Sequence, residues 1–478
     1  MSIKHALKWS FLSEIASKAI QPLVFVILAR LLTPEDYGVV AAAIMVISFS
    51  QIFWDAGMSK AIIQFQGDRT AAANAAFWIN NVLGVVVAGV VVVISGIVSD
   101  KIFHDPRVAL VLQVMALQVV LSALVSIHTA LLQKDMRFKH LFWVRLATVA
   151  IPGLVSIPLA WYGMGYWALV AGTLAGQVIQ VVILWKTSPW KPRFSFDVPM
   201  AKQLARFGGW VAATGLLAWF YLWADSLIVG MYLGSHELGL YRTGNAFVMM
   251  IFGFLFGPMM PVLYSYLSGI QDNREHVKEV LLKVVRVISL ISIPLGIFLY
   301  LSAQLVADFV FGENWRGVGI VIGVSALTHG LAWLVGVNGE VYRVLGRPNI
   351  ETWIMGLCLI FYLPAYLISA QISFEVFLWT RLLIVFPALM VHWIFLRKLN
   401  LSPSLSHLKA ILYYSLSLSL LIALPELIRF PDKGVSIPYF VFLLIAITYI
   451  IAVTWLLMRP TIIELVVYFR PSHARVTP

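Results

Sequence analysis

Two long apolar runs near the start of the chain are joined by the heptapeptide Leu32-Thr33-Pro34-Glu35-Asp36-Tyr37-Gly38. Threonine is a good N-cap, proline suits the first helical position, and acidic side chains are favoured in the first turn of a helix. The heptapeptide therefore predicts a tight turn at which one helix ends and the next begins. Because both flanking runs are apolar, the two helices are predicted to span a membrane.

The same turn recurs about two hundred residues later as Leu233-Gly234-Ser235-His236-Glu237-Leu238-Gly239. An offset of 201 aligns Leu32 with Leu233 and Gly38 with Gly239, and it places Trp9 opposite Trp210. This weak internal repeat predicts two copies of one helical lobe. Since each lobe is predicted to hold six spans, an even number, the two lobes are expected to be parallel repeats related by an axis along the membrane normal.

The composition is that of a membrane protein. The chain has 478 residues, of which 61% are hydrophobic and 12% charged, and its mean hydropathy is +0.90. Runs of about twenty apolar residues recur along its length, so we predict an all-α polytopic protein with about fourteen transmembrane helices. The predicted organisation is an N-terminal six-helix lobe with a cytoplasmic connection at 1–207, a second lobe at 208–400, and two further helices with a tail at 401–478.

Two local features refine this plan. The seventh span is predicted at Gly208–Tyr232, after an amphipathic segment, Thr187–Phe207, that is expected to lie along the inner membrane surface. Prolines within the spans, among them Pro258 and Pro387, predict kinks because proline lacks the amide hydrogen of the helical hydrogen bond.

The positive charges alternate between the connections. The chain has 34 Lys and Arg residues and a net charge of +12. Of the 34, 25 lie in one alternating set of connections and at the two ends of the chain, 6 lie in the other set, and the remaining three fall within or at the ends of spans. By the positive-inside rule, both termini are predicted to be cytoplasmic. This distribution favours membrane loops over a nucleic-acid partner, and no outer connection is long enough for a folded domain.

Motifs for catalysis or for cofactors are absent from the sequence. There is no phosphate-binding G-x-x-x-x-G-K-[ST] loop, and the ten histidines show no metal-ligand spacing. The single cysteine, Cys358, lies in an apolar run and allows no disulfide within the chain. We therefore expect no catalytic residues, no metal and no cofactor, and the distinctive chemistry is confined to a few polar groups inside spans.

The turn region resembles a known family. Residues Ala29–Gly38, continuing through Gln51–Ser59, are similar to the Wzx-like polysaccharide flippases of the multidrug/oligosaccharidyl-lipid/polysaccharide exporter superfamily. Leu132–Lys139 and Leu238-Gly239-Leu240-Tyr241 also resemble the subgroup that serves bacterial exopolysaccharides such as colanic acid and xanthan. The resemblance covers most of the first twelve predicted spans in pattern, and the first sixty residues in detail.

This resemblance implies a multi-pass protein of the bacterial inner membrane that is a transporter and not an enzyme. It would move undecaprenyl-diphosphate-linked oligosaccharide repeat units from the cytoplasmic to the periplasmic leaflet, by alternating access between the lobes. The implied partners are this lipid-linked cargo, the surrounding membrane lipids, and the machinery that polymerises and exports the polysaccharide.

Cations inside spans are the first candidates for binding such a cargo, because charge is costly in a bilayer and is usually functional there. Lys18 lies one helical turn after Glu14, so both share a face; they bind diphosphate and couple to an ion, or they form a structural pair near the inner end of the helix. Arg242 and Arg381 suit phosphate through their planar fork. Their alternative role is anchoring at the outer surface.

Three polar residues complete the candidate set. Asp225 is the candidate carrier of a proton or sodium ion, because burial lets a carboxyl change its charge state; the alternative is a pair with a neighbouring cation. Gln21 and Asn245 are candidates for binding sugar hydroxyls, against the commoner role of such amides in helix–helix hydrogen bonds.

Two other functions remain open from the sequence alone. One is a cation-coupled exporter of small amphipathic molecules, from the same superfamily. The other is a membrane polymerase or glycosyltransferase of the same pathway, although such enzymes usually place catalytic residues on a large outer loop.

Charge reversal at Lys18 or Arg381 is expected to reduce export more than the same change at Arg397, a plain inner-loop charge. The reason is that only a cavity-facing cation contributes to binding an anionic head group. Export measured for the three variants side by side checks this, and equal effects would refute the assignment of Lys18 and Arg381 to a cavity.

Overall fold

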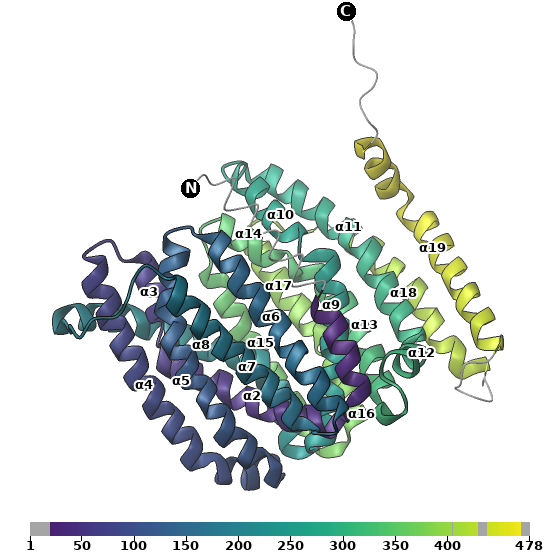
Figure 1. The fold of residues 1–478 in the computed structure, drawn as a ribbon. Coiled ribbons are helices and arrows are strands. Elements are labelled where there is room, and N and C mark those ends of the chain that lie inside the picture. The colour runs from purple at the N-terminus through teal and green to yellow at the C-terminus, as the bar shows by residue number, and fades with distance from the viewer. Residues whose placement is uncertain (1–19, 404, 429–436, 470–478) are drawn as a thin grey trace, which may run out of the picture. The chain divides into compact units, whose positions relative to one another are not determined.

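The computed structural model describes residues 20–403, 405–428 and 437–469, and these residues form helices joined by short connections (Figure 1). A first helix, Ile20–Leu31, is followed in chain order by α2 (Pro34–Asp55), α3 (Met58–Gln64), α4 (Arg69–Val98), η1 (Ser99–Phe103), α5 (Pro106–Lys134), α6 (Phe138–Trp161), α7 (Tyr166–Thr187), α8 (Val198–Tyr232), α9 (Ser235–Phe256), α10 (Met259–Ser268), α11 (Arg274–Leu301), α12 (Ala303–Val306), η2 (Ala307–Phe311), η3 (Glu313–Trp315), α13 (Val318–Gly336), α14 (Asn338–Val344), α15 (Asn349–Ile372), α16 (Phe374–Leu383), α17 (Val385–Lys398), α18 (Leu405–Ile428) and α19 (Ile437–Phe469).

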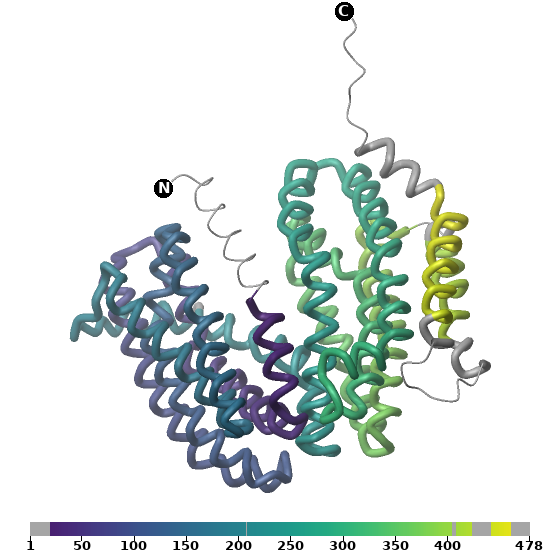
Figure 2. The backbone as a smooth tube through the Cα atoms, turned by 45° about the vertical axis from the view of Figure 1, so that its right-hand side comes forward, coloured from purple at the N-terminus to yellow at the C-terminus, as the bar shows by residue number. Residues whose placement is uncertain are grey.

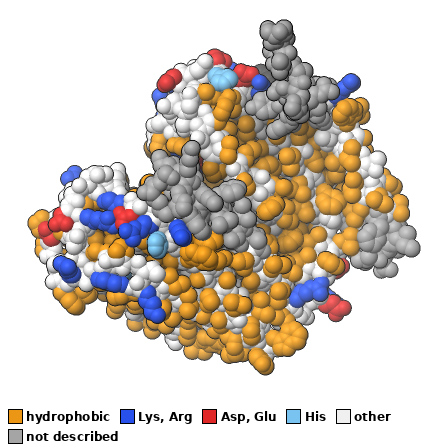
Figure 3. All heavy atoms as spheres, turned by 45° about the horizontal axis from the view of Figure 1, so that its top comes forward, with side chains coloured by type: hydrophobic (Ala, Val, Ile, Leu, Met, Phe, Trp, Pro, Cys, Tyr) orange, Lys and Arg blue, Asp and Glu red, His pale blue; other side chains and the backbone are white. Residues whose placement is uncertain are grey.

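The all-helical membrane architecture predicted from the sequence is confirmed. In the described part of the chain, 12 helical segments are long and apolar enough to cross a membrane, and two shorter apolar helices, Ile20–Leu31 and Leu408–Ile422, accompany them. Hydrophobic side chains cover broad areas of the face shown in Figure 3, and the charged side chains visible there gather in a few places. The total of fourteen spans is compatible with this structure and remains a prediction.

The helices pack into two compact units. One comprises Met1–Thr243, Val310–Trp315 and Tyr366–Phe374, and the other comprises the remaining residues, so the division falls within α9. In each unit the long helices run roughly side by side (Figure 2). The lobes predicted at 1–207, 208–400 and 401–478 follow the sequence repeat and remain a prediction.

The predicted helix start after Thr33 is confirmed, and it takes the form of a capping box. The Thr33 hydroxyl accepts the amide hydrogen of Asp36 at 3.3 Å, and the Asp36 carboxylate accepts the Thr33 amide hydrogen at 3.0 Å. The other Asp36 oxygen accepts the amide hydrogen of Tyr166 at 2.9 Å. The capping residue therefore also ties the start of α2 to the start of α7.

The two copies of the repeated turn meet in the first unit. A Cβ atom added to Gly38 would lie 1.7 Å from the carbonyl oxygen of Ser235, and one added to Gly239 would lie 1.8 Å from the carbonyl oxygen of Pro34. Real atoms never approach so closely, so the first turns of α2 and α9 touch backbone to backbone. Glycine at the two equivalent positions of the repeat is what permits this contact.

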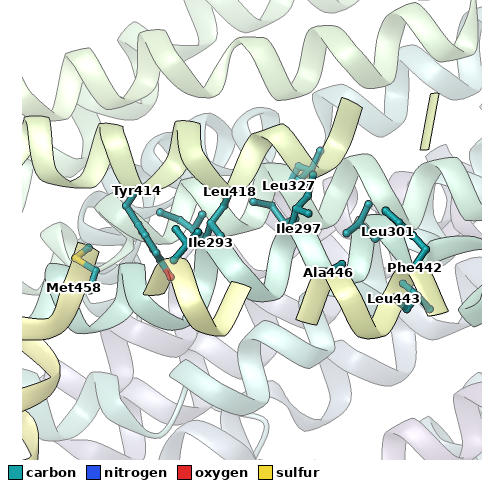
Figure 4. Packing of buried hydrophobic residues seen from close by; sticks show 12 residues of the cluster. Ile293, Ile297, Leu301, Leu327, Tyr414, Leu418, Phe442, Leu443, Ala446 and Met458 are labelled. Atoms are coloured by element: carbon teal, nitrogen blue, oxygen red, sulfur yellow. The ribbon is translucent and has the colours of Figure 1, made fainter. Parts of the chain in front are cut away.

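The second unit has its own hydrophobic cluster, formed by α11, α13, α18 and α19 (Figure 4). The Tyr414 side chain is fully buried in it, and its hydroxyl shares a 2.8 Å hydrogen bond with Thr454 on α19. The two C-terminal helices are therefore packed against α11 and are not loose appendages. The cluster consists of Ile293, Ile297, Leu301, Leu327, Tyr414, Leu418, Leu421, Phe442, Leu443, Ala446, Val453 and Met458.

Gly38→Ala is expected to lower the free energy of unfolding by about 1–3 kcal/mol or more, because its new methyl group overlaps the Ser235 carbonyl and forces the backbone apart. Gly89→Ala is the matched control, since a Cβ atom at this exposed helical glycine meets nothing within 4 Å. Thermal unfolding of the purified proteins in detergent measures the difference. Identical melting of the two variants would show that the backbone contact contributes nothing to stability.

Candidate functional site

A polar cluster lies between α8 and α9 in the first unit. The Asp225 carboxylate accepts hydrogen bonds from the Ser226 amide at 2.6 Å, from the Ser226 hydroxyl at 3.0 Å and from the Tyr241 hydroxyl. The Arg242 guanidinium donates to the Ser226 hydroxyl at 3.3 Å and lies over the ring of Trp223, 4.1 Å from its centroid. We call these residues the Asp225 cluster; two of its members, Asp225 and Arg242, are candidates from the sequence.

The two charged side chains of the Asp225 cluster, Asp225 and Arg242, are connected in buried surroundings. Ser226 and Tyr241 are fully buried, and the low polarity of such surroundings strengthens hydrogen bonds and charge interactions. The Ser226 hydroxyl links the carboxylate to the guanidinium because it donates to one and accepts from the other. The position of the Asp225 carboxylate and that of the Arg242 guanidinium are therefore linked through one hydroxyl group.

A second polar cluster lies in the other unit, where side chains of α9 and α16 contact α13. The amide oxygen of Asn245 is 3.2 Å from Nε2 of His329, and Nη1 of Arg381 donates to the Ser325 hydroxyl at 3.3 Å. Ser325 and His329 are one helical turn apart on α13, so they share a face. Since an amide oxygen only accepts, the His329 tautomer that satisfies this bond carries its hydrogen on Nε2. We call these four residues the His329 cluster.

The sequence candidates thus fall into four groups. Asp225 and Arg242 belong to one cluster, and Asn245 and Arg381 belong to the other. Gln21 is exposed on the helix Ile20–Leu31 and takes part in neither cluster. Glu14 and Lys18 lie outside the described residues. The roles assigned to these residues remain proposals.

His329 was missed by the sequence reasoning. Its signal was available, because a histidine in the middle of the apolar helix Val318–Gly336 is as unusual as any other ionisable group within a span. The candidates from the sequence were chosen mainly among residues that are charged at neutral pH, whereas histidine with its ordinary pKa is mostly neutral there. No group of three or more His, Cys, Asp or Glu side chains among the described residues is arranged to hold a metal ion.

The second unit also contains an apolar cavity of about 590 Å³ between α11, α13, α17 and α18. Most of its lining is Leu, Ile, Val and Phe, and its cationic lining residues in the described part of the chain are Arg286 and Lys409. Two lining residues have buried polar atoms without a hydrogen-bond partner among the described residues, the Asn338 Oδ1 and the Trp393 Nε1. The cavity therefore suits a hydrocarbon with a polar or anionic end.

The sequence is similar to proteins of polysaccharide biosynthesis. Residues 27–319 match the model of a family described as polysaccharide biosynthesis protein. The succinoglycan biosynthesis transport protein ExoT of Rhizobium meliloti is 24% identical over 72% of this chain and 70% of its own length. The lipopolysaccharide biosynthesis protein WzxC of Escherichia coli is 20% identical over 77% and 75%, and the teichuronic acid biosynthesis protein TuaB of Bacillus subtilis is 23% identical over 84% of each chain.

Solved structures share the fold. The lipid II flippase MurJ in an inward closed conformation superposes with a TM-score of 0.75 over 95% of this chain and 100% of its own, at 12% sequence identity. An inward-facing multidrug resistance MATE family transporter of the MOP superfamily superposes with a TM-score of 0.62 over 81% of this chain and 96% of its own, also at 12% identity. The chain therefore shares the helix arrangement of these two transporters.

Asn245→Leu is expected to lower the free energy of unfolding by about 1–3 kcal/mol, because it removes the acceptor of a half-buried ring nitrogen at His329. In Asn245→Leu/His329→Leu both hydrogen-bonding groups are absent, so the double variant should lose less than the sum of the two single variants. Denaturation of the four proteins gives this cycle. Strictly additive losses would show that the two side chains do not interact.

Proposed function

The chain belongs to the polysaccharide biosynthesis protein family, and on that basis we propose that it flips undecaprenyl-diphosphate-linked oligosaccharide repeat units across the bacterial inner membrane. It is a multi-pass membrane transporter and not an enzyme, since its relatives include proteins named for transport and its fold is that of flippases and exporters. The cargo moves from the cytoplasmic to the periplasmic leaflet and supplies exopolysaccharide synthesis.

The relatives support a polysaccharide precursor as cargo. Their names refer to succinoglycan, lipopolysaccharide and teichuronic acid, and each alignment spans at least 70% of the relative. What these products have in common is a long sugar chain, while the sugars themselves differ. The proposal therefore names the class of cargo and leaves its sugar composition open.

The observation that carries the proposal is the pair of arginines held inside spans. Arg242 is the eighth residue of α9 and Arg381 the eighth of α16, so each lies about 10 Å along its helix at 1.5 Å per residue. Each donates to a serine hydroxyl on a neighbouring helix, which fixes the direction of its fork. A diphosphate needs such planar, permanently charged donors, and a neutral drug does not.

The apolar cavity gives further support. A lipid-linked cargo combines a long hydrocarbon with an anionic head, and the cavity combines aliphatic walls with Arg286 and Lys409. Burial of hydrocarbon in it is favourable by roughly 25 cal/mol per Å² of apolar surface. The same cavity would be of little use to a cargo without a tail.

Transport proceeds by alternating access with both chain termini in the cytoplasm, and the cargo then passes to the enzymes that polymerise and export it. Lys18, Arg242 and Arg381 bind the diphosphate, and Gln21 and Asn245 bind sugar hydroxyls. Asp225 and Glu14 couple the movement to an ion gradient. The link from Asp225 through Ser226 to Arg242 supports this assignment, because it connects the coupling group to a cargo-binding group.

The experiment uses a strain that lacks this protein and makes the lipid-linked repeat unit. Expression of the chain should move the repeat unit from the cytoplasmic to the periplasmic face, where a membrane-impermeant enzyme or label detects it. An unchanged cytoplasmic pool with and without the gene would contradict the proposal. Efflux of amphipathic drugs without any effect on this pool would instead favour the cation-coupled exporter.

Asp225→Asn is expected to reduce flipping at least about tenfold and to remove its response to an uncoupler, because the amide cannot change charge. Asparagine keeps an oxygen that accepts from Tyr241, so the fold should persist. Asp272→Asn, in an exposed turn, is the matched control. If Asp225→Asn flips cargo at the rate of the control and stops on addition of uncoupler, Asp225 is not the coupling group.

A further inference from the structure

The contact between the two repeated turns has a local two-fold symmetry. The offset of the sequence repeat is 201, and Glu35 and His236, which are 201 residues apart, touch one another with Oε1 and Nδ1 at 2.5 Å. On either side of this pair, Gly38 meets Ser235 while Gly239 meets Pro34. A shift of 201 residues converts one contact into the other, because Gly38 corresponds to Gly239 and Pro34 corresponds to Ser235. The two turns therefore contact each other through equivalent surfaces.

Such a contact is self-complementary in the same way as the interface of a symmetric dimer. The sequence repeat and the geometry were observed independently, and they agree on the position of the axis, which passes between Glu35 and His236. If the repeats are related by an axis along the membrane normal, the two turns close on one another at that axis. The charge distribution predicts that both turns lie on the outer side of the membrane.

Polar groups beside the axis hold the first turn of α9 against the start of α5. The Ser235 hydroxyl donates to the Asp105 carboxylate at 2.7 Å, and Arg107 pairs with the same carboxylate at 2.8 Å. Burial raises the pKa of Asp105, but the hydrogen bonds from Arg107 and Ser235 outweigh burial and leave its pKa below the usual value. The carboxylate therefore remains an acceptor for the first turn of α9 at neutral pH.

The central pair is weak enough to open. The side chains of Glu35 and His236 are 38% and 41% exposed, so water screens their attraction. The backbone contacts on either side lie at residues 34–38 of α2 and 235–239 of α9. Separation of the turns breaks the partly exposed Glu35–His236 pair and leaves the helices themselves intact.

We propose that the first turns of α2 and α9 form the outer gate of the transporter, closed through Glu35–His236 and the Gly38 and Gly239 contacts, and that they separate to release cargo. This inference rests on the proposed function. It assigns the gate to residues that bind no cargo, and it requires that the pair opens in every transport cycle.

Cross-linking tests the gate. The single cysteine is first replaced by Cys358→Ala, and Glu35→Cys/His236→Cys is then joined by a short reagent that reductant cleaves. The cross-linked protein should lose flipping at least about tenfold and recover it after reduction. The matched control is Arg69→Cys/Asp135→Cys, which replaces an exposed bidentate pair joined at 2.7 Å, between the start of α4 and the end of α5. Cross-linking of this pair should leave flipping unchanged.

Each outcome is decisive. If the Cys358→Ala protein moves no lipid-linked repeat unit, the proposed function fails. If the cross-linked gate pair flips cargo as fast as its reduced form, the proposed function stands and the gate inference is wrong. Spin labels on the same two cysteines supply a readout independent of flipping. A short distance should be joined by a longer one when lipid-linked oligosaccharide is added to the purified protein, and a single unchanged distance would overturn the gate.

Discussion

The backbone contact between Gly38 and Ser235, with its repeat-related partner between Gly239 and Pro34, constrains much of the first unit. Two helices that approach this closely must begin at the same depth, so the register of α2 fixes that of α9. The capping box at Thr33 and Asp36 sets where α2 begins, and Asp36 also holds the start of α7. One heptapeptide therefore aligns three helices, and it does so with bonds that a bilayer interior could not replace.

The sequence predicted those features that depend on local chemistry. The helix start at Thr33 follows from capping, and the interruption between α9 and α10 falls at Pro258 as the kink prediction requires. The break between α16 and α17 lies at Ile384, three residues before Pro387, because proline leaves the carbonyl one turn earlier without its helical donor. Each of these signals is contained in a few consecutive residues, so it survives without knowledge of the tertiary structure.

Features that depend on packing were not predictable in the same way. The seventh span was predicted to begin at Gly208, but α8 begins at Val198, where Asp197 caps it. The polar residues before Gly208 suggested a surface segment. They are also compatible with a helix that extends beyond the apolar run. The partner of Asn245 is a histidine 84 residues away, and no local pattern connects them. The repeat predicted that two turns are equivalent, and only the structure placed them in contact.

Helix α9 contributes residues to both polar clusters and also forms the proposed gate contact at its first turn. Arg242 and Asn245 are three residues apart on this helix, and each belongs to a different cluster. The first turn of the same helix contains Ser235 and His236, so the contact between the turns and Arg242 of the Asp225 cluster share one helix within the first unit. A helix transmits a tilt or a shift along its length without a chain of side-chain contacts. If the outer turns separate, Arg242 is therefore expected to move with the first turn of α9.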